Sequence, residues 1–168
     1  RANFTAVTLS DMLYCLGGVR RGAEGVYLGL STVERYRAGA WERLPNMTSP
    51  RAQHAAVAFE NSIFVLGGMD DDNEAMELAE RFDPSTGVWQ QVADMPTARY
   101  GFAAVACGGA IYAVGGYDID DDAVATVHRY SPASDAWEVM ADMPEPRLYH
   151  AVVVRGDFIY VLGGELDG

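Results

Sequence analysis

The chain has 168 residues, of which 49% are apolar, and a formal net charge of −12. This length and composition fit one packed domain and exclude a disordered chain. The acidic charge argues against nucleic acid and against an anionic membrane surface as partners, because both are bound through clustered Lys and Arg.

Short β-rich runs follow one another along the chain. Gly, Pro, Asp and Ser are frequent between them, and these residues are typical of turns. The pattern therefore predicts an all-β fold. In chain order from residue 54, the runs are HAAVAF (54–59), IFVL (63–66), MELAERF (76–82), VWQQVA (88–93), FAAVAC (102–107), IYAV (111–114), TVHRY (126–130), AWEVMA (136–141), HAVVV (150–154) and IYVL (159–162).

The runs belong to an internal repeat. An aromatic residue, two further residues and Gly-Gly recur as YCLGG (14–18), FVLGG (64–68), YAVGG (112–116) and YVLGG (160–164), spaced by 50, 48 and 48 residues. Other landmarks keep the same register, which is the signature of a repeat architecture. They are Trp41, Trp89 and Trp137; Met47, Met95 and Met143; Arg51, Arg99 and Arg147; and the triplets ERY, ERF and HRY at 34–36, 80–82 and 128–130.

Four strands in a period near 48 residues are typical of a β-propeller blade, and a period near 50 is the kelch value. With its Gly-Gly, Trp, Met and Arg landmarks, the sequence resembles the kelch family, and most closely the kelch-like group of BTB-BACK-kelch adaptors. The resemblance implies a partial propeller of three four-stranded blades and half of a fourth. The expected repeats are 1–50, 51–98 and 99–146, with 147–168 incomplete.

A structural core follows from the landmarks. Ala and Val suit the first strand of each blade, next to the narrow axis. Gly-Gly allows the backbone to turn with positive φ, and Trp is expected to fill the gap between blades. The predicted core residues are Gly17, Gly18, Trp41, Gly67, Gly68, Trp89, Gly115, Gly116, Trp137, Gly163 and Gly164.

Three and a half blades leave two blade faces and one strand edge uncovered. We therefore expect the chain to be a segment of a longer protein whose further blades close the propeller. Self-association of two copies is the second possibility.

Two acidic stretches, DDDNE (70–74) and DIDDD (118–122), follow Gly-Gly. They do not fit a phosphate-binding loop, because no helix or Lys accompanies them. They also lack the ligand order of an EF-hand, so no metal or other cofactor is expected. Solvated loops are the first interpretation, and attraction of a basic partner is the second.

The resemblance implies that a protein partner binds on the face formed by the loops after Gly-Gly and by the Met-x-x-x-Arg connections. A structural role for each Arg, bonding one blade to the next, is the alternative. Because no Ser follows these Arg residues and the loops are acidic, a mixed or basic partner is expected rather than an acidic one. The candidate partner-binding residues are Arg51, Arg99, Tyr100, Arg147, Leu148, Met69, Asp70, Tyr117, Asp118 and Glu165.

No catalytic constellation is apparent, and the chain is not expected to be an enzyme. His54 and His150 occupy one repeat position, two blades apart, which argues against a shared metal ion. His128 is expected at the surface. Cys15 is expected to be a small buried hydrophobe, and the two cysteines, Cys15 and Cys107, make no disulfide framework.

The function expected from the resemblance is a protein-interaction module, as in the substrate-recognition part of a cullin-RING ubiquitin-ligase adaptor. The alternative is a structural or cytoskeletal kelch scaffold, either actin-associated or axonemal, and a kelch-type enzyme comes third. The sequence contains no apolar run of transmembrane length and begins with no pattern typical of a signal peptide. With so few cysteines, a reducing, cytoplasmic location is expected.

Overall fold

The computed structural model describes residues 1–166, apart from the side chain of Glu24. The last two residues of the expected fourth repeat, 167–168, therefore lie outside the described residues. Within the described part, the regular structure consists of 16 strands and one three-residue 3-10 helix, η1 (Ala23–Gly25), without any α-helix. The predicted all-β fold is confirmed.

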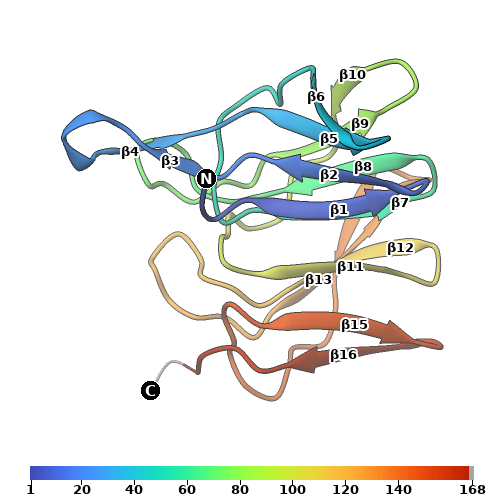
Figure 1. Ribbon diagram of the computed structural model, residues 1–168. Coiled ribbons are helices and arrows are strands. Elements are labelled where there is room, and N and C mark those ends of the chain that lie inside the picture. The colour runs from blue at the N-terminus through green and yellow to red at the C-terminus, as the bar shows by residue number, and fades with distance from the viewer. Residues whose placement is uncertain (167–168) are drawn as a thin grey trace.

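Three antiparallel sheets of four strands and one of two strands follow each other along the chain (Figure 1). The first contains β1 (Thr5–Leu9), β2 (Met12–Leu16), β5 (Val33–Arg37) and β6 (Ala40–Leu44). The second contains β7 (Ala55–Phe59), β8 (Ser62–Leu66), β9 (Ala79–Asp83) and β10 (Val88–Gln91). The third contains β11 (Ala103–Cys107), β12 (Ala110–Val114), β13 (Val127–Ser131) and β14 (Ala136–Val139), and the last contains β15 (Ala151–Arg155) and β16 (Phe158–Leu162).

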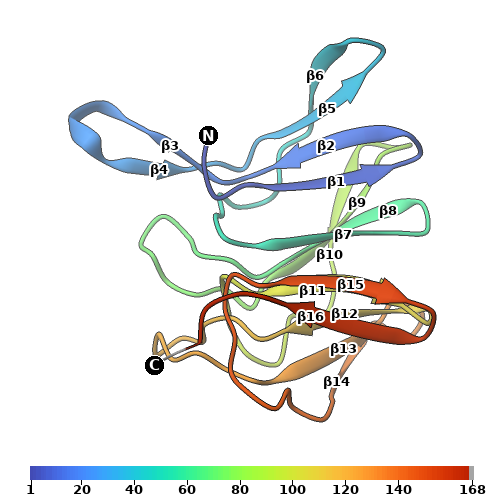
Figure 2. The ribbon, with the colours of Figure 1, turned by 60° about the horizontal axis from the view of Figure 1, so that its bottom comes forward.

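The sheets fan out from their first strands. β1, β7, β11 and β15 lie next to one another, whereas the outer strands β6 and β14 are far apart (Figure 2). The first strands line an open hollow of about 580 Å³ whose walls are mostly Ala and Val, among them Ala56, Ala104 and Val152. These small side chains let neighbouring sheets approach at the axis, as expected for a propeller.

The core lies between the sheets and not within any one of them. β8 is buried along its whole length. Its Ile63 and Val65 pack in the cluster shared with the first sheet, and its Phe64 and Leu66 in the cluster shared with the third. In β16, by contrast, Phe158, Tyr160 and Leu162 are 70%, 43% and 53% exposed, because among the described residues only β15 pairs with it and no further sheet covers it.

The glycine pairs close the junction between blades. Gly67 has a φ of 54°, and a Cβ atom there would lie 2.6 Å from the carbonyl oxygen of Arg99 in the next connection. Among the described residues, no atom lies within 4 Å of the equivalent position at Gly163. Gly is therefore needed both for the left-handed backbone and for the close approach of the next connection.

Where a blade precedes their own, the tryptophans donate a hydrogen bond to it. Trp89 Nε1 donates to Pro45 O at 3.0 Å, and Trp137 Nε1 donates to Ala93 O at 2.8 Å. Trp41 is 51% exposed, because within residues 1–166 no sheet lies on the outer side of the first one. Trp89 and Trp137 therefore bond to the preceding blade, and Trp41 has no such partner among the described residues.

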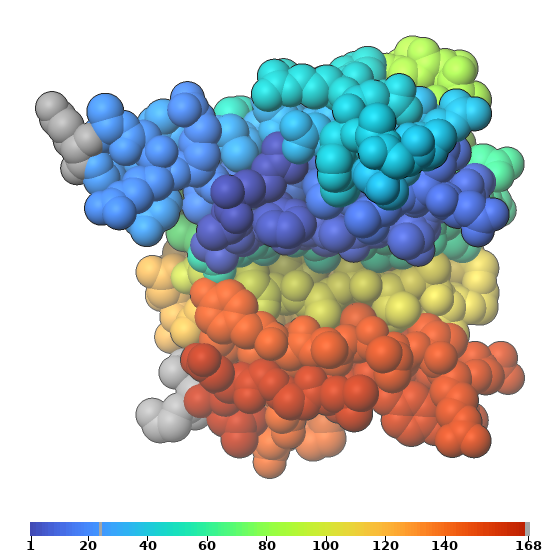
Figure 3. All heavy atoms as spheres, in the orientation of Figure 1, coloured from blue at the N-terminus to red at the C-terminus, as the bar shows by residue number. Residues whose placement is uncertain are grey.

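One element was not predicted. Between β2 and β5 the chain forms a hairpin of β3 (Val19–Arg21) and β4 (Tyr27–Gly29), with η1 at its tip. The hairpin projects beyond the ends of the sheets (Figure 3). Its strands are only three residues long and show no clear alternation, so the sequence pattern gave no strand signal there.

Candidate protein-binding face

The loops after Gly-Gly and the connections from the fourth strand of one sheet to the first strand of the next lie at the same end of the sheets, because successive strands alternate in direction. The hairpin β3–β4 marks this end in Figure 1. We call it the loop face. It consists of residues 17–32, 45–54, 67–78, 92–102, 115–126 and 140–150, together with the segment after Gly164.

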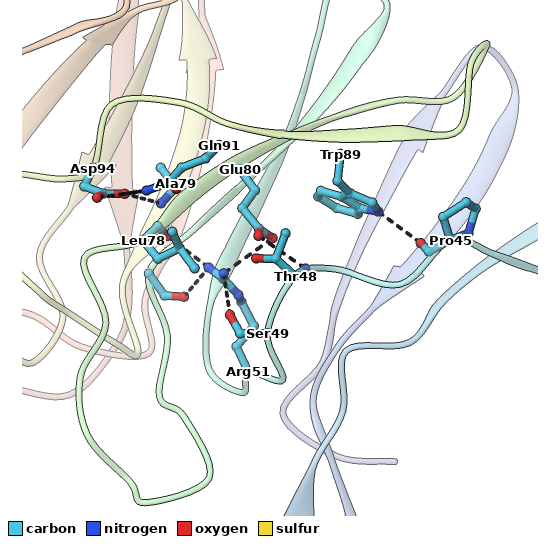
Figure 4. Close-up of polar contacts among 11 residues, drawn as sticks. Pro45, Thr48, Ser49, Arg51, Leu78, Ala79, Glu80, Trp89, Gln91 and Asp94 are labelled. Carbon is cyan, nitrogen blue, oxygen red and sulfur yellow. Dashed lines mark hydrogen bonds and ion pairs between the residues drawn. The ribbon is translucent and has the colours of Figure 1, made fainter.

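Two of the predicted partner-binding arginines are buried in it. Arg51 and Arg99 are 0% and 1% exposed. Arg51 Nη1 donates to Gly67 O at 3.1 Å and to Leu78 O at 2.9 Å (Figure 4). Arg99 Nη1 repeats this with Gly115 O at 3.1 Å. The prediction that these side chains are presented to a partner is wrong, because they satisfy backbone carbonyls at the start and end of a Gly-Gly loop.

Arg147 makes the same bond in the last blade but remains accessible. Its Nη1 donates to Gly163 O at 2.9 Å, and its side chain is 30% exposed. The greater exposure arises because no third strand follows β16 within the described residues.

Each buried arginine also faces a side chain from the third strand of its own blade. Arg51 Nη2 lies 3.4 Å from Glu80 Oε2, and Arg99 Nη2 lies 3.2 Å from His128 Nδ1. His128 is 2% exposed, so the prediction of a surface position is wrong. His128 and Glu80 occupy the same repeat position, 48 residues apart, and both are buried against the arginine of their blade.

Burial dominates the protonation of these groups. It lowers the pKa of Arg51 and raises that of Glu80, in each case against the favourable charge of the partner. Burial, followed by the positive charge of Arg99, lowers the pKa of His128 to about 4. At neutral pH, His128 is therefore uncharged and can accept a hydrogen bond from the guanidinium.

The residues after each arginine form the floor of the loop face. Tyr100 and Leu148 are 8% and 1% exposed, and their backbones pair with Tyr117 and Glu165. Ala52 pairs with Met69 in the same way. Met69 and Tyr117 are half-buried and Glu165 is exposed. Of these candidates, the side chains of Tyr100 and Leu148 support the loops and are not free to contact a partner.

Three tyrosines gather beside these pairs. The rings of Tyr100 and Tyr117 lie 5.0 Å apart, and those of Tyr117 and Tyr149 lie 6.3 Å apart. Tyr149 is 53% exposed and donates from its hydroxyl to Gln53 Oε1 at 2.8 Å. Sequence reasoning missed Tyr149, although its position directly after the Arg147-Leu148 pair could have indicated it.

The two acidic loops have the same internal geometry. Asp70 Oδ1 accepts from the backbone N–H groups of Asp72 and Glu74, at 2.9 and 3.0 Å. Asp118 Oδ1 accepts equivalent bonds at 3.0 and 3.1 Å. Such Asx bonding shapes the loop. The predicted Asp70 and Asp118 thus hold their own loops, and the outward carboxylates are those of their exposed neighbours Asp72, Glu74, Asp120 and Asp122.

The hairpin adds a basic and apolar projection to this acidic face. Arg20 and Arg21 are exposed, and Val26 and Tyr27 are 58% and 65% exposed. Its base is tied to the first acidic loop, since Gly29 N donates to Asp71 Oδ1 at 2.7 Å.

The histidines at the first-strand position are packing residues. His54 and His150 are 4% and 7% exposed, and the equivalent Phe102 is 7% exposed. The ring Cε1 atoms of His54, Phe102 and His150 each approach the first glycine of a Gly-Gly pair in the same way. Across residues 1–166, no three His, Cys, Asp or Glu side chains form a group that could hold a metal ion. Cys15 and Cys107 are half-buried free thiols.

The repeated four-stranded sheets, the inter-blade glycines and the arginine contacts together define a kelch-type β-propeller segment. The chain belongs to the kelch-repeat family: the sequence model described as "KLHDC2/KLHL20/DRC7 Kelch-repeats domain" matches residues 3–168. Within the residues described, no helix is both long enough and apolar enough to cross a membrane.

Two relatives share part of the chain. Beta-scruin of Limulus polyphemus is 35% identical over 89 residues, which cover 51% of this chain and 10% of beta-scruin. Kelch-like protein 41b of Danio rerio is 30% identical over 82 residues, which cover 49% of this chain and 13% of that protein. The matched segments thus span only a small part of either relative.

Proposed function

We propose that the chain is a protein-interaction module, acting in the cytoplasm, whose loop face recruits a partner through a basic segment. The observation that carries this proposal is the pair of acidic loops in consecutive blades, held in one geometry by Asp70 and Asp118. Preorganised carboxylates of one sign steer a basic partner and bind it at little ordering cost. Tyr117 and the exposed Tyr149 supply aromatic contact area beside them.

The finer role that we propose is substrate recognition within a cullin-RING ubiquitin-ligase adaptor. This choice rests on the resemblance of the repeat landmarks to the kelch-like adaptors, and Kelch-like protein 41b is one of the relatives. BTB and BACK domains upstream in the full-length protein, and its co-purification with a cullin, would test it. The alternative is a filament-associated scaffold, which co-sedimentation of the full-length protein with filaments would favour.

We also propose that further blades, or a second copy of the chain, cover the two open ends. The exposed Tyr36 and Trp41 at one end and Phe158 at the other support this, since large contiguous apolar patches mark interaction sites. Light scattering of the purified chain tests whether a second copy covers the open ends, because that arrangement predicts the mass of a dimer.

Binding at the loop face is tested with a fluorescent peptide of alternating Arg and Ser. The double variant Asp120→Asn/Asp122→Asn is expected to weaken binding, and added salt should weaken binding to the parent chain, because exposed charges are screened within about 8 Å at physiological ionic strength. The matched control, Asp11→Asn/Asp157→Asn, changes net charge equally at the opposite end of the sheets. Equal weakening by both double variants would show attraction to net charge alone and would refute the loop-face site.

A further inference from the structure

Two equivalent clefts open at the end of the sheets opposite the loop face, where the turns between first and second strands lie. One, of about 310 Å³, lies between the first and second sheets and is lined by Tyr14, Arg35 and Pro84 among others. The other, of about 290 Å³, lies between the second and third sheets and is lined by Phe59, Phe64, Arg81 and Pro132 among others. Each lining residue of one has its repeat equivalent in the other. We call the second the Arg81 cleft.

The arginines at this repeat position differ in their partners. Arg35 donates from Nε to Glu42 Oε1 at 2.7 Å, and Arg129 donates from Nη1 to Glu138 Oε2 at 3.0 Å. In both pairs the two residues lie directly opposite each other on neighbouring strands. The residue opposite Arg81 is Gln90, so the repeated acidic partner is replaced by a neutral side chain.

Arg81 is nevertheless held in place. Its Nε donates to the buried Ser62 Oγ at 2.8 Å, and its guanidinium carbon lies 6.0 Å from the centre of the Phe64 ring. Within residues 1–166 it forms no ion pair, and the side chain is exposed at the cleft. A positioned guanidinium with free terminal nitrogens matches the two oxygens of a carboxylate.

We propose that the Arg81 cleft binds a carboxylate attached to an apolar group, with Arg81 as the anion ligand and Phe59, Phe64 and Pro132 as the apolar wall. The carboxylate belongs either to an acidic peptide or to a free carboxylic acid. The equivalent cleft at Arg35 does not bind it, because Glu42 already occupies that guanidinium. This site is independent of the loop face. Among the described residues that line the cleft, Glu60 is the one acid, and its charge opposes an anion.

The first experiment titrates 3-phenylpropionate into the purified chain and follows the backbone and Arg Nε–H resonances by NMR. We expect shifts at Arg81 and Phe64 and none at Arg35 or Tyr117. The neutral 3-phenylpropionamide, which has nearly the same shape, should bind about tenfold more weakly or worse, because a hydrogen bond to a charged group is lost. Equal binding of acid and amide would overturn the proposal.

Variants separate a specific site from surface charge. Gln90→Glu restores the ion pair of the neighbouring blades and is expected to abolish the Arg81 shifts while keeping the fold. Glu60→Ser, which copies Ser10 of the first cleft, should tighten binding. Arg129→Gln removes one positive charge elsewhere and should leave binding unchanged. Retained binding in Gln90→Glu, or equal loss in Arg129→Gln, would refute the assignment.

The source of the carboxylate is distinguished by an N-acetylated, C-amidated peptide, Phe-Glu-Phe, and its Phe-Gln-Phe counterpart. Preference for the Glu peptide indicates an acidic peptide segment as the ligand. Binding of 3-phenylpropionate but not of the Glu peptide indicates a free carboxylic acid.

Discussion

The side chains of Arg51 and Glu80 are both 0% exposed, and Nη2 of the first lies 3.4 Å from Oε2 of the second. Arg51 comes from the connection that enters the second sheet, and Glu80 comes from its third strand. The pair therefore fastens the entry of the blade to its middle. Glu80 also accepts a hydrogen bond from Thr48 N at 3.3 Å in the same connection.

Removing Arg51 should lower the unfolding free energy much more than replacing Glu80. Arg51→Ala leaves a buried carboxylate and the carbonyls of Gly67 and Leu78 without their donor, so we expect a loss of about 3–5 kcal/mol of unfolding free energy. Glu80→His copies the Arg99–His128 arrangement of the third blade and should cost about 1 kcal/mol, mainly for the bond to Thr48. Urea unfolding of the three chains measures both, and similar losses would contradict the structural role.

The tryptophans provide a second test, because the same residue type is covered in one blade and open in another. Trp89 stacks on Phe82 at 4.8 Å and donates to the preceding blade, so Trp89→Ala should cost about 3 kcal/mol. Trp41→Ala, at an open face, should cost less than about 1 kcal/mol. Thermal unfolding that lowers Tm equally for both would contradict the inter-blade assignment of Trp89.

Repetition explains what the sequence could predict. The Gly-Gly pairs, the tryptophans and the strand runs depend on local sequence and recur in every blade. Their spacing was therefore enough to predict the blades. The roles of Arg51 and Arg99 could not be predicted in this way, since an arginine at a loop can point outward or inward. Arg51 points inward because folding brings the carbonyl groups of Gly67 and Leu78 together, and both accept hydrogen bonds from its guanidinium. The bonds of Asp70 and Asp118 to their own loops could not be predicted either, because they depend on the loop conformation.

The glycines allow backbone strain and contact to be separated. Gly67 and Gly108 have nearly equal φ values of 54° and 55°, but a Cβ at Gly67 would lie 2.6 Å from Arg99 O whereas nothing lies within 4 Å at Gly108. Both Ala variants carry the cost of a left-handed residue, about 1 kcal/mol. Gly67→Ala should cost a further 1–3 kcal/mol or so, because the next connection must move. Equal costs in chemical unfolding would mean that the junction is looser than described.

His54 should make the stability of the fold depend on pH. Burial, followed by the nearby charge of Arg51, lowers the pKa of His54 to about 3, well below its value of 6.5 in an unfolded chain. Below pH 6.5 His54 binds a proton in the unfolded state but stays neutral in the folded state. The unfolding free energy therefore falls with falling pH until about pH 3. On going from pH 7 to pH 5, His54 alone should lower the unfolding free energy by about 2 kcal/mol. His54→Phe, which copies Phe102 of the next blade, removes that loss.

The measurement is the difference in unfolding free energy between His54→Phe and the parent chain at the two pH values, so that the other titrating groups cancel. We expect the variant to gain about 2 kcal/mol relative to the parent on going from pH 7 to pH 5. A difference that stays constant with pH would mean that His54 takes up its proton in the folded state, and hence that its ring reaches water between the blades.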